Sequence, residues 1–169
     1  ASNVKDQEPF VDITDGEQPS AFTTYQEAQN ALEIDDFGTA KEKFNLAKDL
    51  DGLKFRAPSE INEIIKDQAQ KNVLTTYVPV HEAFEENSDE GLIGFDLMLE
   101  HLHPNQQGYF LIGKTFSQVL LSDLEKKGAI TTETNRNWDY YFEKMHLTYF
   151  DHRVQWHRIS TLKQGFPFV

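Results

Sequence analysis

The chain has 169 residues and carries 16 Lys and Arg against 28 Asp and Glu, which gives a formal net charge of −12. Its length suits one ordinary domain, and the 38% hydrophobic content with 13 Phe argues for a folded core rather than disorder. The acidity argues against a nucleic-acid backbone or an anionic membrane surface as the main partner, and the absence of cysteine excludes disulfides, thiolate metal sites and a cysteine nucleophile. No apolar run reaches the roughly 20 residues that a membrane span needs.

The first part of the chain, residues 1–20, combines prolines, a glycine and acidic residues without apolar periodicity, which predicts a flexible acidic arm. The next part, residues 21–52, is periodic. Its apolar residues recur at three- and four-residue steps, and they are Phe22, Tyr25, Ala28, Leu32, Phe37, Ala40, Phe44 and Ala47. This spacing predicts two antiparallel helices joined by a turn at residues 35–38.

The second of these helices has the Ala40, Phe44 and Ala47 spacing that is typical of the second helix of a tetratricopeptide repeat. Small alanines let two helices approach closely while Phe44 fills the groove between them. Gly52 stands where a proline usually ends the repeat, and no second copy follows. We therefore expect a tetratricopeptide-like hairpin, with a generic helical hairpin as the alternative.

The third part, residues 53–128, is predicted to contain both helices and a strand. Pro58 begins a helix with an apolar stripe, residues 73–78 form a β-branched and aromatic run typical of a buried strand, and Pro104 begins a helix that ends near Gly128. Gly108 and Gly113 inside that helix suggest close backbone packing, for which a sheet is the natural neighbour. The last part, residues 129–169, is predicted to be an aromatic helical tail that starts near residue 131.

The tail also differs from the rest of the chain in charge. Residues 136–169 carry a net charge of +2, which leaves −14 for residues 1–135. A basic tail on an acidic body predicts that the tail docks onto the body.

One segment carries recognisable chemistry. His103 lies immediately before Pro104 and just outside the predicted helix, and Glu100 lies three residues before His103. A carboxylate at this spacing can accept a hydrogen bond from the ring Nδ1–H, which fixes the tautomer and leaves Nε2 as a general base. This is the acid and histidine half of a serine-hydrolase triad.

Simpler interpretations exist for the same residues. His103 could cap the helix, and Glu100 could be a solvated charge. His101 and His103 also form an H-x-H pair, which can bind zinc from a strand if Glu100, Asp96 or His81 supplies a third ligand. The sequence demands no such ligand, and we expect neither a metal nor a cofactor.

The segment LEHLHPNQQGY at residues 99–109 resembles the last conserved block of SGNH (GDSL-type) hydrolases, where an Asp-x-x-His pair precedes proline. The strings AKDLDGLKFRAP at residues 47–58 and INEII at residues 61–65 resemble a bacterial branch of that family with tetratricopeptide-like helices, and the closing GFPF is similar to its terminal region. The resemblance covers roughly residues 28–109. It implies a mostly α chain with a minor β component, which would form the C-terminal part of an α/β/α hydrolase fold.

The resemblance also implies roles for two residues. His103 would be the catalytic base and Glu100 its orienting acid, with Glu replacing the usual Asp. The family's Gly-Asp-Ser nucleophile block does not occur in the sequence. Because the chain also begins without Met, we expect part of a longer esterase or acyl hydrolase that is inactive alone and meets its ester substrate only with the missing N-terminal part.

A truncated sheet would expose unpaired edges, so we expect a homodimer or intramolecular tail docking. The alternative function is a non-enzymatic tetratricopeptide-like module that uses the hairpin and the aromatic tail to hold a protein partner. No targeting segment fixes a location, and an extracytoplasmic full-length protein is compatible with the sequence.

Overall fold

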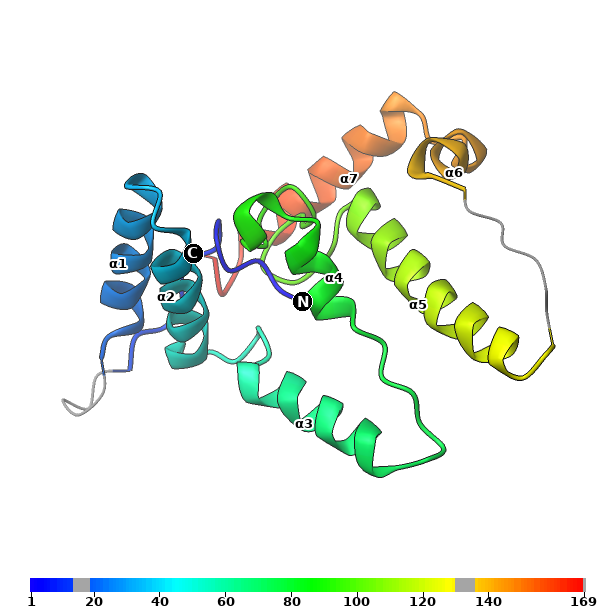
Figure 1. Cartoon of the computed structure of the whole chain (residues 1–169). Coiled ribbons are helices and arrows are strands. Elements are labelled where there is room, and N and C mark those ends of the chain that lie inside the picture. Colours follow the sequence, from blue (N-terminus) through cyan, green and yellow to red (C-terminus); the bar gives the residue numbers. More distant parts are fainter. Residues whose placement is uncertain (14–18, 130–135, 169) are drawn as a thin grey trace. The chain divides into compact units, whose positions relative to one another are not determined.

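The computed structural model describes residues 1–13, 19–129 and 136–168, and these residues form an all-α structure (Figure 1). They contain seven α-helices and one short 3-10 turn, and their only β feature is an isolated bridge between Met98 and Pro104. The chain forms two compact units, Ala1–Leu111 and Ile112–Val169. The predicted predominance of helix is confirmed, whereas the predicted strand is not formed.

The helical hairpin is present as α1 (Ala21–Glu33) and α2 (Phe37–Leu50), in contact with each other. Ser20 caps α1 by accepting a hydrogen bond from the Thr23 amide at 3.1 Å. Asp36 caps α2 in the same way with the Thr39 amide, also at 3.1 Å. The two caps explain where the helices begin, α1 at Ala21 and α2 at Phe37 within the predicted turn.

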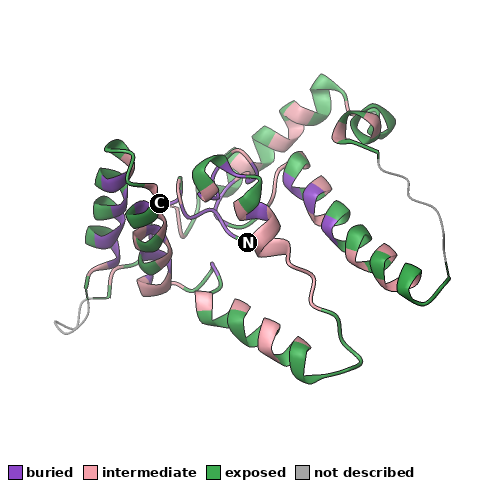
Figure 2. Cartoon of the chain, in the orientation of Figure 1, coloured by how far each residue is buried: buried purple, intermediate pink, exposed green. Residues whose placement is uncertain are grey.

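The core of the first unit is centred on this hairpin. Ala40, Phe44 and Ala47 are fully or almost fully buried, and the Phe44 ring meets the Tyr25 ring edge-on at 5.2 Å between centroids. Val4 and Leu92 complete the same cluster from outside the hairpin. The predicted role of the alanines and of Phe44 is thus confirmed, while the core also recruits two distant segments (Figure 2).

Residues 1–13 pack against the rest of the first unit, in contrast to the flexible arm expected over residues 1–20. The buried Arg56 guanidinium donates hydrogen bonds to the carbonyl oxygens of Asn3, Gln7 and Glu8 and forms an ion pair with Asp51 at 3.1 Å. The segment is therefore held largely through its backbone, which explains why its side chains show no apolar period. Residues 14–18 of the expected arm lie outside the described residues.

Beyond the hairpin, α3 (Ser59–Lys71) and α4 (Val80–Glu86) flank the segment that was predicted to be a buried strand. Val73 and Leu74 are instead 97% and 91% exposed, and residues 72–79 form a turn followed by irregular chain. The strand prediction is wrong for a physical reason. A strand needs a neighbouring strand to hydrogen-bond with its backbone amides and carbonyls, and the described residues offer no such strand.

The 3-10 turn η1 (Asp89–Gly91) leads into a loop and then into α5 (Gln106–Lys126). The helix begins two residues after Pro104 and ends as predicted, with Gly128 in the left-handed region at φ +67°. A Cβ on Gly108 would come within 2.4 Å of the Leu97 carbonyl oxygen, whereas one on Gly113 would meet nothing within 4 Å. The expected close approach is therefore real at Gly108, but it is made to a loop carbonyl rather than to a sheet.

The second unit contains most of α5 together with α6 (Trp138–Met145) and α7 (Tyr149–Leu162). Thr148 and Asp151 form a reciprocal capping box at the start of α7. Several aromatic residues of α7 are exposed, among them Tyr149, Phe150 and Trp156. The predicted helix start near residue 131 lies outside the described residues, and docking of the tail onto the acidic body stays a prediction.

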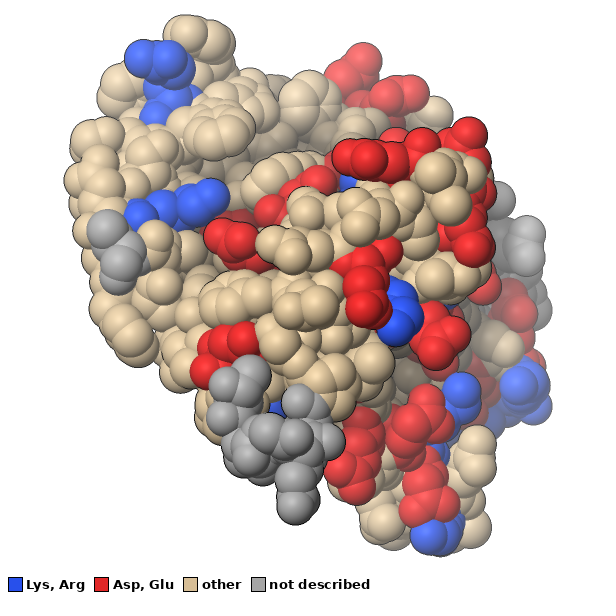
Figure 3. Space-filling view, turned by 90° about the vertical axis from the view of Figure 1, so that its left-hand side faces the viewer, with Lys and Arg blue, Asp and Glu red and all other residues tan. Residues whose placement is uncertain are grey.

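Acidic side chains predominate over basic ones on the face shown in Figure 3, in keeping with the net charge of −12. Within the described residues, we find no helix with the length and apolar character that crossing a membrane requires.

Candidate functional site

Glu100, His101 and His103 lie together in a short closed loop, residues 97–105, which we call the acid–histidine loop. The Leu99 amide donates to the His103 carbonyl at 2.8 Å, and the Asn105 amide donates to the Leu97 carbonyl at 2.9 Å. These two bonds close the chain around residues 99–103, so the three side chains are presented from one tight turn.

Asn105 connects this loop to α5. Its side-chain oxygen accepts from the Gly108 amide at 3.0 Å, and its side-chain nitrogen donates to the carbonyls of Phe95 and Asp96 at 3.3 and 2.8 Å. Asn105 is therefore the residue that caps the helix, a role that the sequence analysis considered as an alternative for His103. The signal that could have identified it is an asparagine directly before the helical run.

The predicted contact between Glu100 and His103 is present. Glu100 is fully buried, and its Oε1 lies 2.5 Å from both the backbone nitrogen and the ring Nδ1 of His103. The His103 side chain is 54% exposed, and among the described residues its Nε2 has no hydrogen-bond partner. The arrangement places one ring nitrogen on a buried acid and leaves the other available to a reacting group.

The electrostatics of Glu100 suit an orienting acid. Burial alone would raise the pKa of Glu100, but hydrogen bonds from the His101 ring, the His103 amide and the His103 ring outweigh burial and lower the pKa of Glu100 to about 2. Glu100 is therefore a carboxylate at neutral pH. A carboxylate on Nδ1 keeps the proton there and stabilises the imidazolium that forms when Nε2 accepts a proton.

Sequence reasoning gave His101 no catalytic role, yet the structure places it on the other oxygen of the same carboxylate. Its ring Nδ1 contacts Glu100 Oε2, and the residue is only 7% exposed. The His101 ring is flanked by Phe10 at 5.2 Å and Phe55 at 5.9 Å between centroids. The only sequence signal for this contact was the alternation of the two histidines.

Of the three residues considered as a third zinc ligand, Glu100 contacts the Nδ1 atoms of both histidines with its own carboxylate oxygens, so the rings face the carboxylate rather than a shared metal position. Asp96 accepts from the Gly94 amide at 3.0 Å, and His81 lies on α4 with its Nε2 3.5 Å from Glu85. In residues 1–13, 19–129 and 136–168, no group of three or more His, Asp or Glu side chains is arranged to hold a metal ion.

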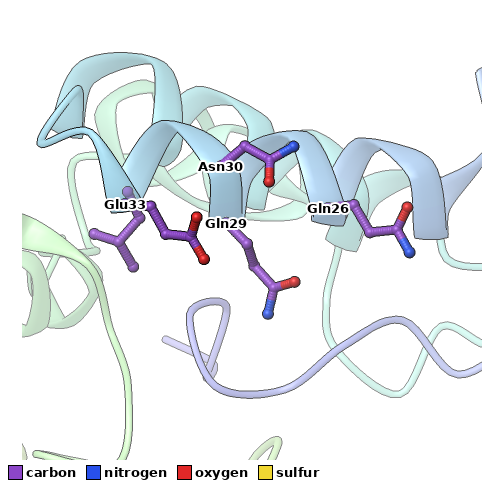
Figure 4. A pocket seen from close by; sticks show the side chains of 5 residues that line it. Gln26, Gln29, Asn30 and Glu33 are labelled. Carbon is purple, nitrogen blue, oxygen red and sulfur yellow. The ribbon is translucent and has the colours of Figure 1, made fainter.

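A shallow hollow of about 420 Å³ lies on α1 (Figure 4), and none of its lining residues belongs to the acid–histidine loop. Its lining residues all come from that helix, and they are Gln26, Gln29, Asn30, Leu32 and Glu33. A protein-interaction hairpin is expected to offer an exposed apolar groove. Four of the five residues that line this hollow are polar, so the interaction-module function stays a prediction without specific support from it.

No family model, no curated protein and no solved structure matches this chain. A functional assignment therefore depends on the resemblance of residues 99–109 to the hydrolase block and on the geometry of Glu100 and His103.

Proposed function

We propose that the acid–histidine loop is the acid–base half of a serine ester hydrolase of the SGNH type. His103 is the general base, and Glu100 is the acid that orients it. The observation that carries this proposal is the 2.5 Å contact between Glu100 Oε1 and His103 Nδ1, with Glu100 buried and His103 half exposed. A buried acid behind an accessible imidazole is the arrangement that activates a serine hydroxyl.

In this mechanism, His103 Nε2 accepts the proton of a serine hydroxyl while the serine oxygen attacks the acyl carbon of the ester. His103 then returns that proton to the leaving alcohol, which produces an acyl-serine. Water hydrolyses the acyl-serine in a second round in which His103 again accepts and returns a proton. Glu100 remains a carboxylate throughout and stabilises the charged form of His103.

The nucleophile would come from sequence outside these residues, because no Gly-Asp-Ser occurs here. The same proposal includes the finer fold, in which the chain is the C-terminal part of an α/β/α hydrolase with its hairpin inserted. Exposed apolar residues support it: Ile61, Ile64 and Ile65 on α3 and Phe116 and Leu120 on α5. Helices that cover a parallel sheet need apolar faces of this kind.

The test is hydrolysis of p-nitrophenyl acetate by a longer gene product that contains this chain and an upstream Gly-Asp-Ser. We expect His103→Ala to lower kcat by roughly 10³-fold or more, because the general base is lost. His157→Ala is the matched control, since the same change is made at an exposed histidine on α7. Equal activity in wild type and His103→Ala, or an open reading frame without the nucleophile block, would contradict the proposal.

A further inference from the structure

We infer that His101 is a positioning residue that fixes the Glu100 carboxylate from its second oxygen and thereby sets the orientation of His103. The inference rests on the proposed function only for the consequence of that orientation, namely a base aimed at a serine. The contacts themselves belong to the chain as it stands.

The Glu100 carboxylate contacts two imidazole rings, those of His101 and His103. Oε1 of Glu100 faces the amide and the ring Nδ1 of His103, each at 2.5 Å, while Oε2 contacts Nδ1 of His101. Both histidines therefore approach through the same ring atom, from opposite ends of the carboxylate. For both contacts to be hydrogen bonds, both rings must carry their proton on Nδ1.

His101 is itself held in place by segments from elsewhere in the first unit. The Phe10 ring lies at right angles to the His101 ring, and the Phe55 ring packs at 5.9 Å between centroids. The His101 carbonyl accepts from the Asn3 amide at 3.1 Å. Asn3 in turn lies in the segment that Arg56 holds through its carbonyl groups. The ring therefore sits in a fixed frame rather than on a free loop.

The reason why Glu100 needs a second anchor is its length. A glutamate side chain has one more rotatable bond than an aspartate, and a carboxylate bound through one oxygen can still turn about its last bond. A buried Oε2 without a donor would also lose its water and gain no replacement, which is costly. His101 Nδ1 contacts Oε2 and, when it carries the ring proton, is the donor placed to restrict that rotation and keep His103 Nδ1 on the same oxygen.

The experiment is long-range ¹H–¹⁵N NMR of the histidine rings of this chain at neutral pH, which reports the tautomer of each ring. In the wild type we expect His101 and His103 both to carry the proton on Nδ1. An unconstrained neutral imidazole favours the proton on Nε2, so this pattern identifies the shared carboxylate directly. Finding His101 with its proton on Nε2 in the folded wild type would overturn the inference without any variant.

Two substitutions at His101 separate the effect of its N–H donor from the effect of its aromatic ring. His101→Phe keeps an aromatic ring between Phe10 and Phe55 but removes the donor, and we expect the His103 Nδ1–H signal to weaken as its tautomers mix. His101→Asn removes the ring but places an amide N–H close to the position of Nδ1, and we expect it to restore the His103 tautomer. An unchanged His103 tautomer in folded His101→Phe would overturn the inference, as would a failure of folded His101→Asn to restore it.

These readouts need no ester hydrolysis, so they fail independently of the proposed function. If the tautomers respond as expected but the longer protein hydrolyses no ester, His101 still positions Glu100 and the proposed function is wrong. If His103→Ala abolishes hydrolysis but His101→Phe leaves the His103 tautomer unchanged, the function stands and the positioning role does not.

Discussion

Helices α2 and α3 carry similarly regular apolar stripes but lie in different surroundings. On α2, Ala40, Phe44 and Ala47 are inside the core of the first unit. On α3, Ile64 is 46% exposed and its neighbours Ile61 and Ile65 are exposed to a similar degree. The period of a stripe identifies the face of a helix that is able to pack. It does not identify a partner, and only α2 has found one within the described residues of this chain.

The partners of α2 explain the difference. Helix α1 directly precedes α2 in the hairpin, so Tyr25 reaches the Phe44 ring across a short turn. Val4 and Leu92 then cover the same cluster from distant parts of the chain. Helix α3 is followed instead by the exposed segment that contains Val73 and Leu74. The bulkier apolar stripe on α3 is therefore about half exposed. The stripe on α2, which has small residues and one phenylalanine, forms part of the core.

Replacing the central residue of the packed stripe should have the largest effect on stability. We expect Phe44→Ala to lower the free energy of unfolding by about 3–5 kcal/mol, because it removes a buried ring and leaves a cavity. Urea unfolding followed by circular dichroism measures this. Ile64→Ala on α3 is the comparison, with an expected loss below about 1 kcal/mol. Equal losses for the two substitutions would show that α3 is as well packed as α2.

The second largest expected effect on stability comes from the charge of the buried Glu100 carboxylate, and this effect depends on pH. The pKa of Glu100 is about 2 in the folded chain against an ordinary value of 4.5, so its stabilising contribution is complete above about pH 4.5 and is lost as the pH falls towards 2. At neutral pH this contribution is on the order of 3 kcal/mol. We expect the stability difference between wild type and Glu100→Gln to shrink over this interval, as measured by urea unfolding at a series of pH values. A difference that stays constant would mean that the carboxylate is not held by the two histidines.

Helix α5 is packed at its start and open in its middle. Substitutions of its two glycines give the smallest of the three expected effects on stability. Gly108→Ala should cost about 1–3 kcal/mol, because the new Cβ would come within 2.4 Å of the Leu97 carbonyl oxygen. Gly113→Ala, five residues later and with nothing within 4 Å, should instead raise stability by about 0.5–1 kcal/mol through helix propensity. Thermal unfolding of the two variants gives opposite shifts in Tm if the start of α5 is packed and its middle is open. Shifts of the same sign would contradict this.

Features set by neighbouring residues could be predicted from the sequence. The hairpin followed from the spacing of Tyr25, Ala40 and Phe44, and the contact between Glu100 and His103 followed from a three-residue separation next to a proline. Both depend on local geometry that a few residues determine. The catalytic role of Glu100 and His103 stays a prediction.

Features set by distant residues could not be predicted in this way. The fixed position of His101 depends on Phe10, Phe55 and Asn3, which come from two other segments. The packing of residues 1–13 depends largely on backbone hydrogen bonds, to Arg56, Asp51 and the carbonyls of Ile93 and His101, and backbone groups carry no sequence signal. The expected strand at residues 73–78 failed for the same reason, since strand propensity is realised only beside a second strand.

The attachment of residues 1–13 has a consequence for the order of events during synthesis. Within the first unit, this segment is synthesised well before the residues that hold it, because the Val4 and Asn3 amides pair with the carbonyls of Ile93 and His101. Residues 1–13 therefore lack these hydrogen-bond partners until nearly the whole first unit has been translated. Closing such long loops costs chain entropy before any contact repays it, which makes this a late and slow step in folding. The acid–histidine loop reaches its final geometry only when residues 1–13 pair with it.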